Sequence, residues 1–360
     1  MRLGTCIALE LFVVAAAAGG VSLAVSRGSE LARSYVQAHE AAAATPGPAP
    51  ELTLVPLPRA RLAIARPPPD TVFGAPDHDL LLPIAATPLV KVKLNHGGTS
   101  LSLRLDFASG ARAAFKPLQT HPQSDPRREI AAYRIDRLLG IGHVPPAKSA
   151  AFAIDDVIAA VEPAGRAVAA QRIADEALPR RGKLVGEVSW WIPDIKLVHL
   201  DGHGIDEPEG QAAWTAYLQA GATIPAELRP VVAQIATVVL FDLLIDNSDR
   251  WSGNNTQGSL DSRTLYFMDN TLSFSTYTLG HTANLSKLYR IQVFPRTLVA
   301  RLRALTVESV EAALGGEDDL LGPLLTRAEI RAIIARRDHF LEYIDRLIAE
   351  LGEDAVLALP

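Results

Sequence analysis

A loop rich in carboxylate and amide side chains directly follows the most apolar segment of the chain. Residues 246–255 read Asp-Asn-Ser-Asp-Arg-Trp-Ser-Gly-Asn-Asn, and they come after the apolar run 230–245. In this loop, the Asp249 carboxylate is suited to accept or orient the proton of a hydroxyl group, and the Asn254 amide oxygen is suited to bind a hard divalent cation. A loop of Asx turns that only ends a helix would have a similar composition.

Lys116 is a candidate for binding phosphate oxygens. It closes the alternating segment 111–116, and Ala114, two residues earlier, lies on the same face of a strand. A small side chain at that place leaves room for a purine base while the ammonium group reaches the phosphates. A lysine at the end of an exposed strand is otherwise an ordinary solvated side chain.

Glu129 and Asp269 supply two further carboxylates. Glu129 lies in the first turn of the next expected helix, where it can form an ion pair with Lys116 or serve as a metal ligand. Asp269, followed by Asn270, stands at the end of an expected short strand. Hard oxygen ligands of this kind, with no thiolate or clustered imidazole beside them, favour Mg²⁺ or Mn²⁺ over zinc.

The order of these groups along the chain predicts phosphoryl transfer. That reaction requires a cation that holds the phosphates, carboxylates that bind the metal, and a base that orients the acceptor hydroxyl. Lys116, Glu129, Asp249 and Asp269 occur in the order in which kinases place these groups. The segment 249–254 also has the D-x-x-x-x-N spacing of a kinase catalytic loop.

Six short motifs surround these residues. They are Ala114-Phe115-Lys116-Pro117, Glu129-Ile130-Ala131-Ala132-Tyr133, Asp136-Arg137-Leu138-Leu139-Gly140, Val144-Pro145-Pro146, Asp246-Asn247-Ser248-Asp249-Arg250 and Met268-Asp269-Asn270. Together they resemble the secretory-pathway (Golgi) kinase family that includes Four-jointed, the Golgi casein kinase and the glycosaminoglycan xylosylkinase. The chain looks like a distant, bacterial-type, exported relative, and the resemblance covers residues 89–274.

The resemblance implies a fold and a set of residue roles. The fold is a two-lobed, protein-kinase-like α+β fold, with a small antiparallel-sheet N-lobe and a mainly helical C-lobe. Lys116 corresponds to the lysine that binds the phosphates, and Glu129 corresponds to its ion-pair partner. Asp249 corresponds to the catalytic aspartate. Asp269 corresponds to the aspartate that binds the metal, with Glu129 as a further candidate ligand.

The sequence therefore predicts an ATP-dependent kinase that uses Mg²⁺ or Mn²⁺. Its acceptor would be a hydroxyl group on a protein serine or threonine or on a glycan. One alternative is an exported pseudokinase that binds nucleotide or a partner protein without turnover, because Trp251 stands where the family usually has a histidine. A second alternative is a HipA-type kinase, since those enzymes share a related N-x-D-R loop.

Short strands and two prominent helices must position these residues. Alternating or short apolar runs predict strands at 89–95, 100–107, 111–116, 182–192, 196–200 and 265–268. Gly97 and Gly98 lie in the turn between the first two strands and would, by position, cover the phosphates. Asp125-Pro126 begins a helix that Gly140 ends. The run 230–245 predicts a helix buried in the middle of a lobe.

The C-terminal part is expected to be helical. Thr326 and Glu329 form a capping-box pattern that opens a helix to about Leu351. The folded domain is placed at residues 79–360, with the N-lobe at about 79–200 and the C-lobe at about 201–360.

The start of the chain has the outline of an export signal. Arg2 precedes the apolar stretch 11–25, and Glu10 limits the uninterrupted apolar length to less than the roughly 20 residues of a spanning helix. Residues 1–26 are therefore expected to be a signal peptide or a membrane anchor. Residues 27–78, rich in alanine and proline, are expected to form a disordered linker. The protein would act in the periplasm, outside the cell, or on the outer side of a membrane.

Composition restricts the partners. The formal net charge of -5 provides no basic field, so nucleic acid is not an expected partner. Cys6 is the only cysteine and lies in the expected export segment, so the mature chain would have no disulfide or thiolate metal site. His199 and His203 are a weaker alternative metal site, because the glycines around them favour a turn.

Overall fold

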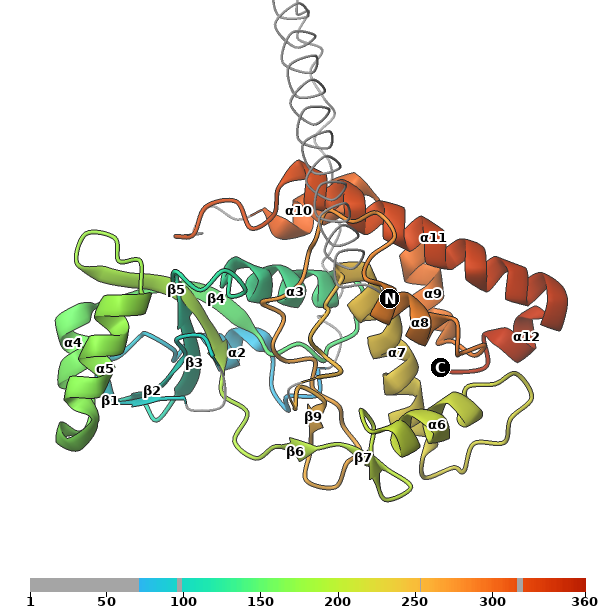
Figure 1. The fold of residues 1–360 in the computed structure, drawn as a ribbon, viewed down its shortest axis with the longest axis horizontal. Coiled ribbons are helices and arrows are strands. Elements are labelled where there is room, and N and C mark those ends of the chain that lie inside the picture. Colours follow the sequence, from blue (N-terminus) through green and yellow to red (C-terminus); the bar gives the residue numbers. More distant parts are fainter. Residues whose placement is uncertain (1–70, 96–98, 253, 316–319) are drawn as a thin grey trace, which may run out of the picture. The chain divides into compact units, whose positions relative to one another are not determined.

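The computed structural model describes residues 71–95, 99–252, 254–315 and 320–360. Within these ranges a five-stranded sheet lies on one side of helix α3 (Arg127–Leu138), and the helices α6 to α9, α11 and α12 lie on the other, while α10 packs against α3 itself (Figure 1). The expected export segment, most of the expected linker, Gly97 and Gly98 lie outside the described residues. In the part of the chain that is described, no helix combines the length and the apolar character needed to cross a membrane.

The sheet is antiparallel throughout, with the strand order β1-β2-β3-β5-β4. The strands are β1 (Leu89–Leu94), β2 (Leu103–Phe107), β3 (Arg112–Pro117), β4 (Ala147–Ala153) and β5 (Lys183–Trp190). This result confirms the three N-terminal strands and the strand expected at 182–192. In β3, Ala113 and Phe115 are buried on one face, so Ala114 and Lys116 point together to the opposite face.

The single strand expected at 196–200 is divided into two short strands, neither of which pairs with β5. Both edges of β5 are already occupied, by β3 and by β4, so no edge is left for another strand. Lys196–Leu197 (β6) pairs instead with Gln257–Gly258 (β9), and His199–Leu200 (β7) pairs with His203–Gly204 (β8).

The expected strand at 265–268 is also absent. Leu265 forms one isolated bridge to Gly258, and the backbone beyond it bonds to other segments. For example, the Phe267 amide donates to the carbonyl of His143. The segment is therefore extended, but its hydrogen bonds go to several partners rather than to one strand.

Two helices that the sequence did not reveal cover part of the sheet. They are α4 (Ile154–Ala159) and α5 (Pro163–Glu176), which lie beside β1 and β4 in Figure 1. Their buried residues, such as Val157 and Ile173, join an apolar cluster with Leu105 and Phe115 of the sheet. A short helix, α2 (Asp77–Leu81), contacts β5.

Helix α3 begins and ends as the sequence predicts. The Asp125 carboxylate accepts a hydrogen bond of 3.0 Å from the Arg127 amide, which supplies a partner for one free N–H of the first turn. Gly140 follows the helix with φ of +59°, a backbone conformation that glycine adopts without a steric penalty.

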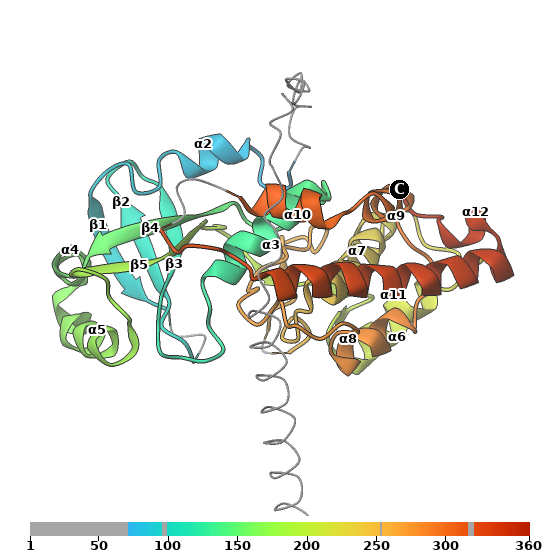
Figure 2. The ribbon, with the colours of Figure 1, turned by 90° about the horizontal axis from the view of Figure 1, so that it is seen from above.

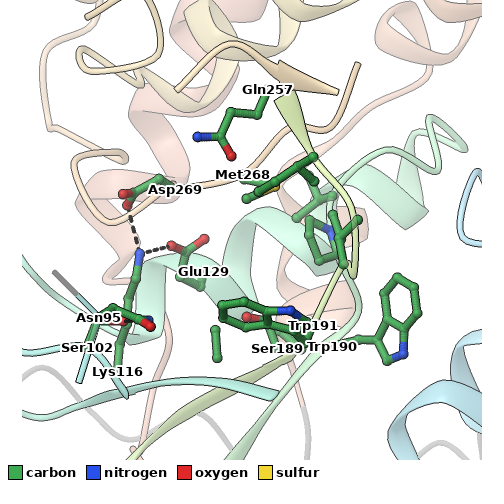
Figure 3. A pocket seen from close by; sticks show the side chains of 16 residues that line it. Asn95, Ser102, Lys116, Glu129, Ser189, Trp190, Trp191, Gln257, Met268 and Asp269 are labelled. Carbon is green, nitrogen blue, oxygen red and sulfur yellow. Dashed lines mark hydrogen bonds and ion pairs between the residues drawn. The ribbon is translucent and has the colours of Figure 1, made fainter. Parts of the chain in front are cut away.

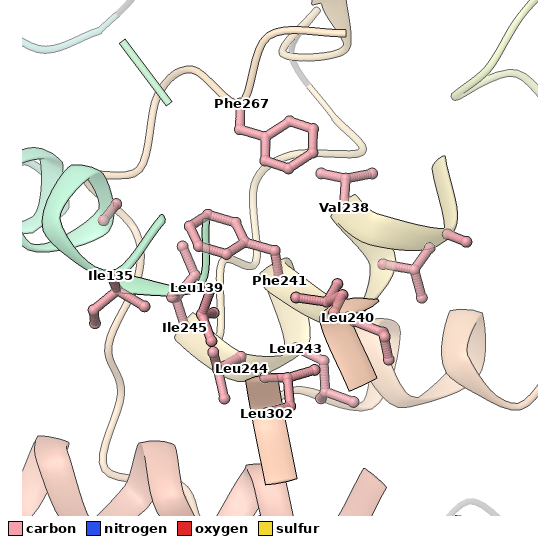
Figure 4. Close-up of a cluster of buried hydrophobic side chains, with 14 of the residues drawn as sticks. Ile135, Leu139, Val238, Leu240, Phe241, Leu243, Leu244, Ile245, Phe267 and Leu302 are labelled. Carbon is pink, nitrogen blue, oxygen red and sulfur yellow. The ribbon is translucent and has the colours of Figure 1, made fainter. Parts of the chain in front are cut away.

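The helical part is built around α7 (Arg229–Ile245). The other helices are α6 (Pro208–Tyr217), α8 (Thr282–Leu288), α9 (Arg296–Arg303), α10 (Val307–Leu314), α11 (Arg327–Leu351) and α12 (Glu353–Val356). Figure 4 shows side chains of α7 packed against Ile135 of α3, Leu139 just after α3, Phe267, and Leu302 of α9. The expected buried helix is confirmed, and it is the main link between the core and the loop that follows it.

Helix α11 is the longest described helix, and its start confirms the capping box. The Thr326 hydroxyl accepts from the Glu329 amide, while the Glu329 carboxylate accepts from the Thr326 amide at 2.6 Å. Figure 2 shows α11 running across the helical part, where it packs against α7, α9 and α10.

Ordered contacts begin before residue 79, where the sequence placed the start of the folded domain. Phe73 is buried and lies 5.8 Å from Trp190 and from Tyr266, measured between ring centroids. Asp77 accepts hydrogen bonds from Arg137 and from Tyr133 of α3. Residues 73–77 therefore pack against the sheet and α3, which an alanine- and proline-rich composition did not indicate.

Candidate active site

Lys116, Glu129 and Asp269 meet at one point. The Lys116 Nζ atom lies 2.6 Å from Glu129 Oε1 and 2.8 Å from Asp269 Oδ1, as Figure 3 shows. The lysine comes from the end of β3, the glutamate from the first turn of α3, and the aspartate from the segment that follows Phe267. Residues separated by 153 positions in the sequence are thus brought into one hydrogen-bonded group.

The sheet places Lys116 through a close approach of two strands. Gly186 on β5 lies opposite Pro117, and a Cβ atom at Gly186 would stand 2.3 Å from the carbonyl oxygen of Lys116. Because that distance is far below van der Waals contact, only glycine allows β5 to lie this close to the backbone of the lysine.

The charges of the three residues reinforce one another. Although burial opposes it, the negative charges of Asp269 and Glu129 raise the pKa of Lys116 above its ordinary value. In return, the Lys116 charge lowers the pKa of Asp269. At neutral pH the group therefore holds one ammonium ion and an ionised Asp269, and the side chain of Asp269 remains 42% exposed.

Asn270 connects this group to the loop after α7. Its backbone N–H and its Nδ2 both donate to Glu129 Oε2, at 3.0 Å and 3.1 Å. Its Oδ1 accepts from Arg250 at 2.7 Å and from Asn247 at 3.2 Å. Asn270 is fully buried, so it serves to orient Glu129 and to fix the two loops against each other. The sequence marked the Asp-Asn pair but gave Asn270 no role.

Arg250 is a structural residue of the loop. It is fully buried, and its guanidinium pairs with Asp242 of α7 at 3.3 Å and donates to the carbonyl of Met268. These bonds tie the loop to α7 on one side and to the Asp269 segment on the other.

Asp249 lies in the same network. Its amide donates to Asn247 Oδ1 at 3.0 Å, and Asn247 Nδ2 donates to the carbonyl of Asp269 at 3.1 Å. The Asp249 carboxylate accepts from Ser252 Oγ at 2.7 Å and from Asn255 Nδ2 at 2.9 Å. The loop therefore holds this carboxylate in a defined orientation, one hydrogen-bonded residue away from Asp269.

The structure distinguishes Asn254 from its neighbour. Asn254 has φ of +66° and an exposed side chain, and its carbonyl accepts from Gln257 at 2.9 Å. Asn255, one residue later, is the amide that contacts Asp249. The D-x-x-x-x-N spacing thus selects a residue whose side chain faces solvent in this state, and the metal role of Asn254 remains a prediction.

Several of the site residues have left-handed backbone conformations. Asp246, which ends α7, has φ of +56°, Asp269 has φ of +54°, and Phe274 has φ of +62°. Asp246 is stabilised there because its carboxylate accepts from the His281 amide at 2.7 Å. Non-glycine residues in this region are uncommon and concentrate at functional loops.

A cavity of about 320 Å³ opens beside Lys116. Lys116, Glu129 and Asp269 lie on one side of it, and Trp191 and Met268 lie on the other (Figure 3). Its remaining lining residues are Asn95, Ser102, Ala114, Val144, Pro145, Ala147, Ser189, Trp190, Ile192, Ile195 and Gln257. The volume is within the range of small-molecule sites, and the lining combines an apolar wall with a charged end.

The carboxylates of the site suit a hard cation. Among the described residues, the two hydrogen bonds to the Asp269 carboxylate both reach Oδ1, which leaves Oδ2 for a ligand. No group of three or more His, Cys, Asp or Glu that could hold a metal occurs within the described ranges, and this includes the turn with His199 and His203. The carboxylates of Asp269 and Glu129 are hard oxygen donors of the kind that Mg²⁺ or Mn²⁺ binds together with phosphate and water, and their role as ligands stays a prediction.

Comparisons with known proteins agree with this geometry. No protein-family model matches the chain. The fold matches the crystal structure of the Golgi casein kinase with Mn/ADP bound, with a TM-score of 0.61, 15% identity and 78% of each chain covered. It also matches the structure of hydra Fam20 with sugar, with a TM-score of 0.58, 16% identity, and coverage of 77% of this chain and 90% of that one. The glycosaminoglycan xylosylkinases of Homo sapiens and Danio rerio are each 23% identical over 76% of both chains.

Fold and relatives together define the class: the protein is a kinase with a two-lobed, kinase-like α+β fold. Within that class, the chain is a distant relative of the secretory-pathway, or Golgi, kinases. Both the fold class and the resemblance drawn from the motifs are confirmed.

Proposed function

We propose that the protein transfers the γ-phosphoryl group of ATP to a hydroxyl group, with Mg²⁺ or Mn²⁺ as cofactor. The observation that carries this proposal is the Lys116 ammonium held between Glu129 and Asp269 at the charged end of the cavity. A cation beside two carboxylates is the arrangement that positions a metal-bound triphosphate.

The cavity supports a role for its apolar wall in binding the base. Ala114 is small and lies on the same face of β3 as Lys116, and Trp191 and Met268 provide flat or flexible apolar surface. A purine in contact with these residues would direct its phosphates toward the Lys116 ammonium. Gly97 and Gly98, which lie between β1 and β2 in the sequence and outside the described residues, are the proposed cover of the phosphates.

Asp269 and Glu129, with Asn254 as a third candidate, would hold the metal. When bound, the ion neutralises the phosphate charge that develops during transfer. Asn270 donates two hydrogen bonds to Glu129 Oε2 and so fixes the carboxylate, while the partly exposed Asp269 is open to solvent. The solved neighbour that contains Mn and ADP supports this choice of cofactors.

Asp249 is the proposed catalytic base. Its carboxylate would accept, or orient, the proton of the acceptor hydroxyl, and its bonds to Ser252 and Asn255 set its direction. Lys116 and Glu129 act with it by placing the phosphates.

The acceptor is proposed to be a protein serine or threonine, or a glycan. The named relatives include a casein kinase, xylosylkinases and a Fam20 protein solved with sugar, and these names support both acceptor classes. The same relatives support an exported location, which agrees with the apolar N-terminal segment of the sequence.

Metal titration tests the proposal. Because the Lys116 ammonium already pairs with both carboxylates, Mn²⁺ should bind weakly to the free protein and at least about tenfold more tightly with a non-hydrolysable ATP analogue. Asp269→Asn should remove the nucleotide-dependent site, whereas Asp261→Asn, an exposed aspartate in the preceding turn, should leave it intact. Mn²⁺ binding can be followed by calorimetry. Tight binding without nucleotide that survives Asp269→Asn would contradict the proposed site.

A further inference from the structure

Glu187 is a buried carboxyl group that the proposed reaction does not yet use. It lies on β5 directly opposite Lys116 of β3, and opposite Ser149 of β4 on its other side. Residues directly opposite each other in antiparallel strands point to the same face, so Glu187 faces the same side of the sheet as Lys116. The side chain is fully buried.

Neither carboxyl oxygen of Glu187 has a hydrogen-bond partner among the described residues. Buried polar groups are nearly always paired, because an unpaired one lowers the stability of the folded state. Burial, and then the negative charge of Glu129, raises the pKa of Glu187 well above its ordinary value. The Lys116 charge and the hydroxyl group of Ser189, two residues along β5, lower this pKa in part, and the charge of Asp269 raises it further. An apolar residue at this position would lower the stability of the folded state less, so we expect the Glu187 carboxyl group to have a role other than stability.

The neighbouring lysine provides one. An ammonium group has three hydrogens to donate. Within the described residues, the Lys116 ammonium donates hydrogen bonds to Glu129 and to Asp269. In the proposed reaction both of these carboxylates also bind the metal. The lysine must then turn toward the phosphates while its existing partners are drawn to the ion.

We propose that Glu187 is a positioning residue for Lys116, which accepts a hydrogen bond from the ammonium group when nucleotide and metal occupy the site. The inference rests on the proposed function, because it requires a bound nucleotide. A carboxyl oxygen accepts a hydrogen bond whether the group is neutral or ionised, so no proton transfer is involved. Glu187 would then gain, in the nucleotide-bound protein, the hydrogen bond that its carboxyl group lacks in the free protein.

Two substitutions test this role. Glu187→Leu removes the acceptor, and with it a buried carboxyl group that has no hydrogen bond in the free protein. Its thermal transition without nucleotide should therefore equal or exceed that of the wild type, while the affinity for ADP with Mn²⁺ should fall about tenfold. Glu187→Gln retains an acceptor oxygen and should bind ADP within about threefold of the wild type. Ser149→Ala, the other cross-strand neighbour of Glu187, is the matched control and should bind ADP like the wild type.

The outcomes separate the two proposals. Wild-type protein that binds no ADP with Mn²⁺ would contradict the proposed function itself. If the wild type binds, unchanged affinity in Glu187→Leu overturns the positioning role, as does loss of binding in Glu187→Gln. A lowered thermal transition, or failure to fold, in Glu187→Leu shows that the residue supports the fold and also overturns the role.

Discussion

The carboxylate of Asp249 is oriented by two side chains of its own loop, Ser252 and Asn255, and its backbone is fixed by Asn247. Because these three neighbours are uncharged, the proposed catalytic role depends on the charge of the Asp249 carboxylate alone. Asp249 does not line the cavity beside Lys116, so the proposed nucleotide site and the proposed base consist of different residues.

Replacement of Asp249 by asparagine should therefore affect rate and not affinity. We expect turnover to fall by about 10² or more, which is the range for loss of a positioned base, while ADP affinity stays near that of the wild type. Phosphate transfer to a casein and glycan panel, together with equilibrium ADP binding, measures both quantities. Wild-type turnover in Asp249→Asn would exclude the role given to this residue.

At the scale of elements, one buried ion pair fixes the helix that carries Glu129. Arg128, the residue before Glu129 in α3, lies 2.5 Å from Glu329 at the start of α11 and also donates to the carbonyl of Phe274. Although burial opposes it, the hydrogen bonds from Arg128 and Thr326 hold the pKa of Glu329 below its ordinary value. Helix α3 is thus attached to the helical lobe at the turn that supplies Glu129.

Loss of this attachment should weaken both the fold and the site. Arg128→Ala leaves Glu329 buried without its charged partner, so we expect a loss of about 3 kcal/mol in the free energy of unfolding and a several-fold loss of ADP affinity. Arg127→Ala is the matched control, because Arg127 is 40% exposed and pairs only with nearby Asp125 in the described structure; its cost should stay within about 1 kcal/mol. Urea unfolding and ADP binding compare the two. Equal effects would show that α3 does not depend on this pair.

The elements that the sequence predicts well are those with a strong local signal. The period-two strands, the capped helix α3, the apolar helix α7 and the capping box of α11 all agree with the structure. Strand β4 reads Ala-Lys-Ser-Ala-Ala-Phe-Ala, which has neither alternation nor β-branched residues, so its pairing with β5 depends on tertiary contacts. The same absence of local signal hides the partners of β6 and β7.

The site residues likewise differ in how far the sequence predicts their positions. The motif order places Lys116, Glu129 and Asp269 in one group, and the structure joins them. Motif spacing cannot resolve which of two adjacent asparagines faces Asp249, because that depends on the left-handed turn at Asn254. Glu187 carried one signal in the sequence, a charged residue in the middle of a strand, but its relation to Lys116 requires the register of β3 and β5.

At the scale of the whole molecule, the contacts of residues 73–77 extend the folded region beyond the expected boundary. Arg137 of α3 lies between Asp77, at 2.6 Å, and the ring of Phe73, whose centroid is 5.8 Å from the guanidinium carbon. These residues join the segment before the sheet to the helix at the centre of the fold.

Two fragments test this boundary. A fragment that starts at residue 71 should unfold like the intact chain, whereas one that starts at residue 79 loses Phe73 and Asp77, one of the two ion-pair partners that the largely buried Arg137 has among the described residues. We expect the shorter fragment to be less stable by at least about 3 kcal/mol. Chemical denaturation of both fragments and of the full chain measures this difference. Equal stability would place residues 71–78 in the linker, as the composition alone indicates.

The left-handed backbone at Asp269 restricts which residues natural variation can offer at this position. Aspartate and asparagine tolerate such a conformation better than most residues with a side chain, and glutamate has no comparable local hydrogen bond to favour it. Glutamate would keep the negative charge but strain the turn, while asparagine would keep the turn but lose the charge. No single substitution of Asp269 by glutamate or asparagine therefore keeps both the negative charge and the left-handed turn.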